Sequence, residues 1–174
     1  MNLVLCGMMG SGKTTLGKAL ASHMKCAWVD TDDVLVERHG NITDIFKEHG
    51  EEYFRDLETK LACELSQKDN LVISTGGGFL LRAENVVLLQ EKGNIVFLRA
   101  QIETLEARLK NDQTRPLLQG GVKEKLLQLI KVRYPLYEQA ADFIVDVDEK
   151  SVEEIASEII NMIKKQERMG ACAR

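Results

Sequence analysis

The stretch GMMGSGKTT, at residues 7–15, constrains the fold of this chain more than any other feature. It follows a short apolar run at residues 3–6, and its spacing of Gly7, four residues and then Gly-Lys-Thr satisfies the P-loop pattern. Such a turn joins a strand to a helix, and its backbone N–H groups form a nest for an anion. The helix that begins at Lys13 directs the positive end of its dipole to the same place. The alternative is a glycine-rich turn without a ligand, but the position between strand and helix favours a bound nucleoside triphosphate.

The P-loop residues predict how this nucleotide and its metal are held. The Lys13 side chain can reach the β- and γ-phosphates, and the Thr14 hydroxyl can ligate Mg²⁺. We expect the nucleotide to contact Gly10, Ser11, Gly12, Lys13, Thr14 and Thr15.

Composition excludes several other classes of protein. A chain of 174 residues with 44% hydrophobic and 29% charged residues is typical of one soluble domain. The net charge of −4 argues against a nucleic-acid-binding face, and no apolar run approaches the roughly 20 residues of a membrane span. No basic segment precedes the first apolar run, so a signal peptide is not expected. The scattered Cys6, Cys26, Cys63 and Cys172 predict free thiols in a reducing cytoplasm, and we expect a monomer.

Short apolar runs alternate with segments of helical period along the whole chain. This alternation is typical of parallel βαβ units with helices on both faces of a sheet. We predict an α/β fold with three α/β/α layers, a five-stranded parallel sheet and the topology of a P-loop NTPase, in one domain at residues 1–165. A mobile lid is expected at about 111–122 and a disordered tail at 166–174. The expected strands are 2–6, 26–29, 71–74, 94–98 and 143–147, and the expected helices are 13–24, 31–39, 43–67, 82–91, 101–110, 122–140 and 151–164.

Carboxylates follow the second expected strand, where they emerge at the ligand-binding edge of an open α/β sheet. Because side chains alternate along a strand end, Asp30 and Asp32 can project to one side together. One could hold the water shell of a metal, and the other could accept the proton of an attacking hydroxyl. Alternatively, Asp32 or Asp33 only caps the next helix.

Three consecutive glycines, residues 76–78, follow the third expected strand. Glycines at such a place allow a ligand to approach the backbone closely. A plain flexible turn is an equally good interpretation of this segment.

Four arginines stand at positions where they could bind a ligand: Arg55, Arg108, Arg115 and Arg133. Guanidinium forks match carboxylate and phosphate oxygens. Each arginine could instead be a solvated charge or part of a helix pair, such as Glu51 with Arg55. Arg115 lies in the expected lid, where a closing arginine can stabilise the charge of a transferring phosphoryl group.

Together these segments resemble the shikimate kinase family over about residues 2–160. The resemblance implies transfer of the γ-phosphoryl group of ATP to the 3-hydroxyl of shikimate, with Mg²⁺ as cofactor, on the route to chorismate and the aromatic amino acids. It is carried by GMMGSGKTTLGKALA, DTDDVLVERHGNITDIFKEHGEEYFRDLE, VISTGGG, TRPLL and RYPLYEQAA.

The resemblance also implies a role for each matching residue. The substrate would lie against helices at about 31–67, with Asp32 on its ring hydroxyls as the candidate base and Asp30 on the metal through water. The other matching residues would be Arg55 and Arg133 on the substrate carboxylate, Gly77 and Gly78 on the ring hydroxyls, Phe46 and Phe54 along the ring, Glu58 orienting the site, Arg108 stacked on adenine and Arg115 on the ATP phosphates.

Other functions remain as alternatives. Gluconate is also a polyhydroxy carboxylate, but gluconate kinases lack the DTD followed by FRDLE and the triple glycine. An adenylate-kinase-like enzyme would need a second set of phosphate-binding arginines. A non-catalytic nucleotide switch would need neither Asp32 nor Arg115.

Overall fold

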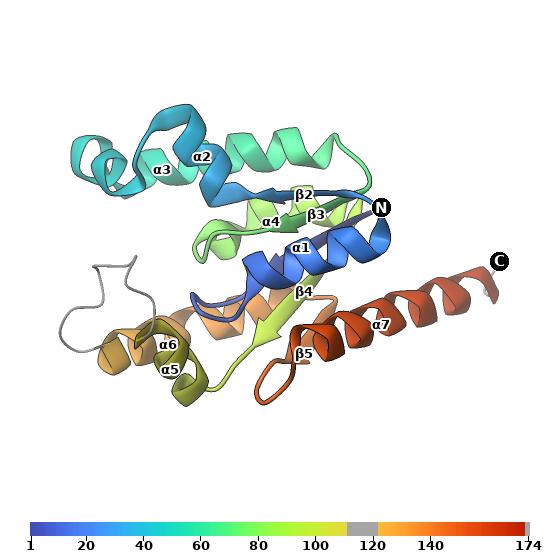
Figure 1. The fold of residues 1–174 in the computed structure, drawn as a ribbon. Coiled ribbons are helices and arrows are strands. Elements are labelled where there is room, and N and C mark those ends of the chain that lie inside the picture. The colour runs from blue at the N-terminus through green and yellow to red at the C-terminus, as the bar shows by residue number, and fades with distance from the viewer. Residues whose placement is uncertain (111–121, 173–174) are drawn as a thin grey trace.

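Five parallel strands form the centre of the fold, in the order β2-β3-β1-β4-β5 (Figure 1). The computed structural model describes residues 1–110 and 122–172. In the central pairings Leu3 lies opposite Val72 on one side and Asn94 on the other. This order and the parallel pairing confirm the predicted sheet. The strands are β1 (Asn2–Cys6), β2 (Ala27–Asp30), β3 (Leu71–Ser74), β4 (Gly93–Arg99) and β5 (Phe143–Asp146).

Helices cover both faces of the sheet, which confirms the three-layer architecture (Figure 1). On one face α1 and α7 pack against each other, while α4 and α6 contact β4 from the other face. The long helix α3 packs on α4 and α2, and α5 packs on α6. The helices are α1 (Lys13–Met24), α2 (Thr31–His39), α3 (Ile42–Ser66), α4 (Ala83–Gln90), α5 (Ile102–Lys110), α6 (Val122–Ala140) and α7 (Val152–Cys172), with a 3₁₀ turn at Phe79–Leu81.

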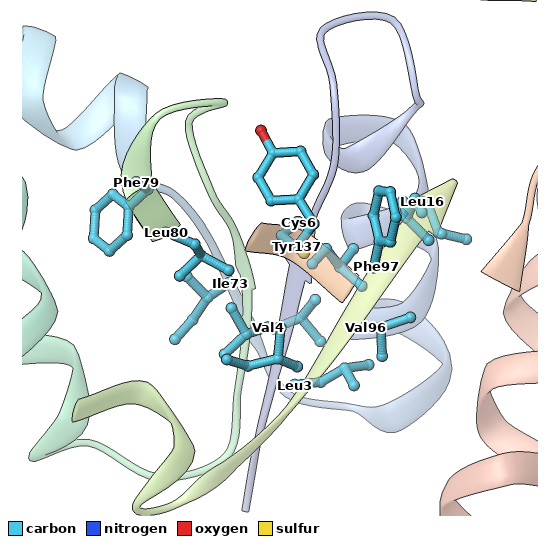
Figure 2. Packing of buried hydrophobic residues seen from close by; sticks show 14 of the residues in the cluster. Leu3, Val4, Cys6, Leu16, Ile73, Phe79, Leu80, Val96, Phe97 and Tyr137 are labelled. Atoms are coloured by element: carbon cyan, nitrogen blue, oxygen red, sulfur yellow. The ribbon is translucent and has the colours of Figure 1, made fainter. Parts of the chain in front are cut away.

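The hydrophobic core lies along the central strands, whose side chains are buried on both faces. All residues of β1 and β3 are buried, whereas the edge strand β2 has none fully buried. Figure 2 shows Tyr137 of α6 packed near Cys6 and Phe97, with its hydroxyl directed away from the apolar cluster. The rings of Phe97 and Tyr137 lie 5.2 Å apart. A rigid core of this kind fixes the strand ends from which the polar site residues project.

The helix α3 differs from its prediction, because Gly50 interrupts it. Gly50 has φ 85° and ψ 173°, which is not helical, so two helical segments meet at a kink. Residues eight apart in a straight helix are separated by roughly 12 Å along its axis. The rings of Phe46 and Phe54, on either side of the kink, instead lie only 5.0 Å apart.

The C-terminal segment corrects another expectation. We predicted a helix ending at residue 164 and a disordered tail at 166–174, but α7 continues to Cys172. Lysine, glutamine, glutamate, arginine and methionine follow residue 164, and such straight-chain residues favour helix without an apolar stripe. Residues 173–174 and the expected lid, except for the start of α6, lie outside the described residues. Within residues 1–110 and 122–172, each helix is too short or too polar to traverse a lipid bilayer.

Candidate active site

The P-loop turns between β1 and α1 through glycines in left-handed backbone conformations. Gly10 has φ 82° and Gly12 has φ 95°, values that side-chain-bearing residues rarely adopt. Lys13 opens α1, and its ammonium group donates to the carbonyl oxygens of Gly7 and Met8 at 2.9 and 3.0 Å. The lysine therefore lies over the loop whose N–H groups were predicted to bind phosphate.

Arg108 connects this loop to the segment that follows β5. Its Nη1 donates to the carbonyl oxygen of Gly10 at 3.1 Å, and its Nη2 donates to that of Val147 at 3.3 Å. Ser11 is buried, and among the described residues its hydroxyl has no hydrogen-bond partner. The structure thus brings Arg108 to the P-loop, whereas Arg115 lies outside the described residues.

Asp30 connects α1, which follows the P-loop, to the first turn of α2. Its Oδ2 accepts a hydrogen bond from Thr14 Oγ1 at 3.0 Å. Its Oδ1 accepts one from the backbone N–H of Asp32 at 3.1 Å, which makes Asp30 the N-cap of α2. The alternative interpretation, in which Asp32 or Asp33 caps this helix, is therefore wrong.

The donor set at Thr14 and Asp30 fits a magnesium ion. A hydroxyl and a carboxylate are hard oxygen donors, and Mg²⁺ commonly binds one or two such groups together with water and substrate phosphates. Across residues 1–110 and 122–172, no group of at least three His, Cys, Asp or Glu side chains could hold a metal ion. These residues therefore fit a metal that arrives with the nucleotide better than one held by protein ligands alone.

The triple glycine packs against side chains from three other helices. Its backbone is fixed in part by Thr31, whose Oγ1 accepts a hydrogen bond from the Gly76 N–H at 2.8 Å. A Cβ atom added to any of these glycines would collide with a predicted site residue. The distances would be 2.2 Å from Gly76 to Asp32 Oδ1, 2.8 Å from Gly77 to Arg133 Nη1 and 2.2 Å from Gly78 to Arg55 Nη1. The segment is therefore a close-packed platform and not a plain flexible turn.

Arg55 makes ion pairs with two glutamates of its own helix. Its Nη1 donates to Glu58 Oε2 at 2.7 Å, and its Nη2 and Nε donate to Glu51 Oε1 at 2.8 and 3.3 Å. The helix pair that the sequence offered as an alternative is thus present. Arg55 is nevertheless buried beside Gly78. It therefore makes the helix ion pair and also lies among the predicted site residues.

Glu58 lies at the centre of the charged cluster, with its side chain only 1% exposed. Burial raises the pKa of its carboxyl to about 7, against the opposing effect of the hydrogen bond and charge of Arg55. The charge of Asp32 raises this pKa further, and the charge of Arg133 lowers it. The charges of both residues therefore influence Glu58, in agreement with the packing of Asp32, Arg55 and Arg133 against the triple glycine.

An apolar wall lies beside Arg55. The guanidinium carbon is 5.6 Å from the ring centre of Phe54 and 6.0 Å from that of Phe46. The kink at Gly50 makes this possible, because it brings the two rings together. The site therefore combines a cationic group with a flat hydrophobic surface.

Tyr137 is a site residue that the sequence did not single out. Its hydroxyl donates to the carbonyl oxygen of Gly77 and also interacts with Arg133. Burial raises the pKa of the phenol, so the hydroxyl keeps its proton. Tyr137 stands four residues after Arg133 and shares its helix face, which was the one available signal.

Comparison with known proteins gives consistent results. The sequence model of the family described as shikimate kinase matches residues 9–164. A shikimate kinase of Caldicellulosiruptor bescii is 45% identical over 163 residues, covering 92% of this chain and 94% of the relative. One from Dictyoglomus turgidum is 42% identical, covering 94% and 97%.

A solved structure gives the same result. A shikimate kinase from Acinetobacter baumannii in complex with shikimate superposes with a TM-score of 0.88 and 35% identity. The similarity covers 95% of this chain and 93% of that one.

Proposed function

The chain belongs to the shikimate kinase family, and on that premise we propose how its residues transfer the γ-phosphoryl group of ATP to the 3-hydroxyl of shikimate. The observation that carries this proposal is the convergence of Asp32, Arg55 and Arg133 on the triple glycine. This cluster lies at the same sheet edge as the P-loop, because Asp30 links Thr14 to Asp32.

The substrate has groups that match this cluster. Shikimate is a small ring with one carboxylate and three hydroxyls, so its site needs a cationic fork and hydrogen-bonding groups close to the ring. Arg55 and Arg133 bind the carboxylate. Asp32 accepts from the ring hydroxyls, and Gly77 and Gly78 offer backbone N–H groups to them.

The apolar wall of Phe46 and Phe54 selects for the shape of the ring. Their rings, 5.0 Å apart, offer a surface against which a six-membered carbocycle can pack. An open-chain polyhydroxy acid such as gluconate has no flat apolar face and gains less from this wall.

ATP lies along the P-loop, with its phosphates on the backbone N–H groups of residues 10–15 and on Lys13. Arg108, already hydrogen-bonded to Gly10 and Val147, forms one side of the adenine site. Thr14 and Asp30 would hold Mg²⁺, with Asp30 acting through water. When bound, the ion offsets negative charge on the β- and γ-phosphates.

In the reaction, Asp32 orients the 3-hydroxyl towards the γ-phosphorus and accepts its proton as the new phosphorus–oxygen bond forms. The bond between the γ-phosphorus and the β–γ bridging oxygen breaks in the same step, and ADP leaves. The transition state of phosphoryl transfer is loose, with its charge on the transferring group, so positioning and cations provide most of the stabilisation. Lys13 and Arg115 supply that positive charge. The lid that the sequence predicts at about 111–122 would exclude water on closing and so limit hydrolysis of ATP.

A substrate panel tests this function. In a coupled assay with Mg-ATP, turnover with shikimate should exceed turnover with gluconate or AMP by several orders of magnitude. Equal rates would contradict the substrate assignment, and tight ATP binding without any turnover would indicate a nucleotide switch.

A paired substitution tests the site. Arg55→Lys should raise the KM for shikimate strongly, because an ammonium group cannot form the bidentate fork. The matched control is Arg38→Lys, which makes the same replacement at a surface arginine whose Nη1 donates to both carboxylate oxygens of Glu64, at 2.8 and 3.0 Å. An unchanged KM in Arg55→Lys would remove Arg55 from the substrate site.

A further inference from the structure

The guanidinium of Arg55 is already engaged on two sides by carboxylates. Glu58 accepts from Nη1, and Glu51 accepts from Nε and Nη2. An arginine can bind a carboxylate bidentately through its Nε–Nη2 edge or its Nη1–Nη2 edge. Of the five N–H donors of a guanidinium, both on the Nε–Nη2 edge of Arg55 donate to Glu51 in this structure. A substrate carboxylate that binds this edge bidentately therefore competes with Glu51, whereas Glu58 accepts only from Nη1.

The exposure of the two glutamates decides which one gives way. The Glu51 side chain is 61% exposed and can rotate into water without a large loss of hydration. Glu58 is 1% exposed, and its carboxylate has no such route. A buried charge that loses its partner is destabilised far more than an exposed one. Glu51 is therefore the group that a third carboxylate displaces.

The local backbone supports this movement. Glu51 directly follows Gly50, whose non-helical backbone separates it from the preceding helical segment of α3. A side chain at the start of a helical segment is not packed against a preceding turn. Glu51 can thus leave Arg55 while Phe54, Arg55 and Glu58 keep their positions in the second segment.

We propose that Glu51 occupies the substrate's place on Arg55 and is displaced by the shikimate carboxylate, so that it sets the affinity of the site for that group. This inference rests on the proposed function, in which Arg55 binds the carboxylate. In this role Glu51 does not take part in the chemical step. It lowers affinity for the substrate while keeping the guanidinium oriented and paired in the free enzyme.

The opposite role is the main alternative, and it predicts a change in the opposite direction. If Glu51 instead stayed in place and supported Arg55 while the substrate is bound, removing its charge would weaken binding. If it competes, removing its charge strengthens binding.

Glu51→Gln tests the proposal, with the KM for shikimate measured by steady-state kinetics and the dissociation constant by calorimetry. Because an exposed ion pair is weak, both constants should fall by roughly two- to fivefold. The KM for ATP is the internal reference and should not change. Glu48→Gln is the matched control, since it removes the same charge from a side chain that is 73% exposed and lies 3.9 Å from His49 Nε2.

Three results would overturn the proposal. A higher KM in Glu51→Gln would establish the supporting role, and an unchanged KM would mean that Glu51 and the substrate do not meet. An equal fall in Glu48→Gln would assign the effect to general repulsion of an anionic substrate.

The double variant Glu51→Gln/Arg55→Lys separates this inference from the function on which it rests. The gain from Glu51→Gln should vanish in the Arg55→Lys background, because the fork is gone. If Arg55→Lys alone leaves the KM for shikimate unchanged, the proposed role of Arg55 fails. If Arg55→Lys raises this KM but Glu51→Gln does not lower it, only the displacement of Glu51 is rejected.

Discussion

The Asp30 carboxylate accepts a hydrogen bond from the Thr14 hydroxyl at 3.0 Å. The same carboxylate caps α2 through the backbone N–H of Asp32. One side chain thus connects the helix that follows the P-loop to the helix that presents Asp32. This connection sets the distance between the proposed ATP site and the proposed shikimate site.

Replacing Asp30 by asparagine should separate its two roles. Asparagine caps a helix as well as aspartate does, so the melting temperature should change little. The lost charge should raise the Mg²⁺ concentration for half-maximal rate by roughly 10- to 100-fold. Asp33→Asn, at an exposed neighbouring position in the same helical turn, is the control. An unaltered Mg²⁺ requirement in Asp30→Asn would show that Asp30 does not serve the metal.

The substitution Gly78→Ala tests the glycine platform. Gly78 has φ −101° and ψ −6°, which alanine adopts easily, so the backbone is not the obstacle. The new Cβ would lie 2.2 Å from Arg55 Nη1, and the guanidinium must move. We expect the KM for shikimate to rise by roughly tenfold or more, because small misplacements of binding groups are costly. The KM for ATP should stay near its original value. If the KM for shikimate is also unchanged, the close contact between Gly78 and Arg55 is not important for binding.

The buried carboxyl of Glu58 should make stability depend on pH. Its pKa is raised from 4.5 to about 7, so the folded protein holds this proton more tightly than the unfolded chain does. The resulting stabilisation is complete below about pH 4.5 and is lost as pH rises through about 7.

Relative to Glu58→Gln, the free energy of unfolding of the original protein should therefore fall by roughly 2–3 kcal/mol between pH 4.5 and pH 8. Denaturant titrations of both proteins at several pH values measure this difference. Parallel profiles would mean that Glu58 is ionised in the folded protein throughout the range.

Arg115 is predicted from the sequence to act on the transferring phosphoryl group. Arg115→Ala should lower kcat by roughly 10³-fold or more if the arginine stabilises transition-state charge. Single-turnover measurements with saturating ATP distinguish this from weaker nucleotide binding. A defect confined to the KM for ATP would make Arg115 a binding residue only.

The sheet could be predicted from the sequence because its strands are short apolar runs between helical segments. All five strands were predicted to within one residue at each end, with β2 shifted one residue towards the N-terminus. The P-loop was equally clear, because its glycine spacing has few other uses. These features depend on local residue patterns, which a sequence displays directly.

The remaining features depend on tertiary contacts or on backbone conformations that residue type does not determine. A glycine within a helical pattern is usually tolerated, so the break at Gly50 was missed although it brings Phe46 to Phe54. The bond from Tyr137 to Gly77 spans 60 residues and has no local signal. The pairing of Glu51 with Arg55 and the place of Arg55 in the site were each visible as possibilities, but the sequence did not show that both would occur together.

The crowding around the triple glycine has a consequence for inhibitor design. Each glycine abuts a different side chain of the predicted site, so a methyl group added to any of them would displace a residue to which we assign substrate binding. A compound that binds mainly to this backbone would meet a surface that the organism cannot readily mutate.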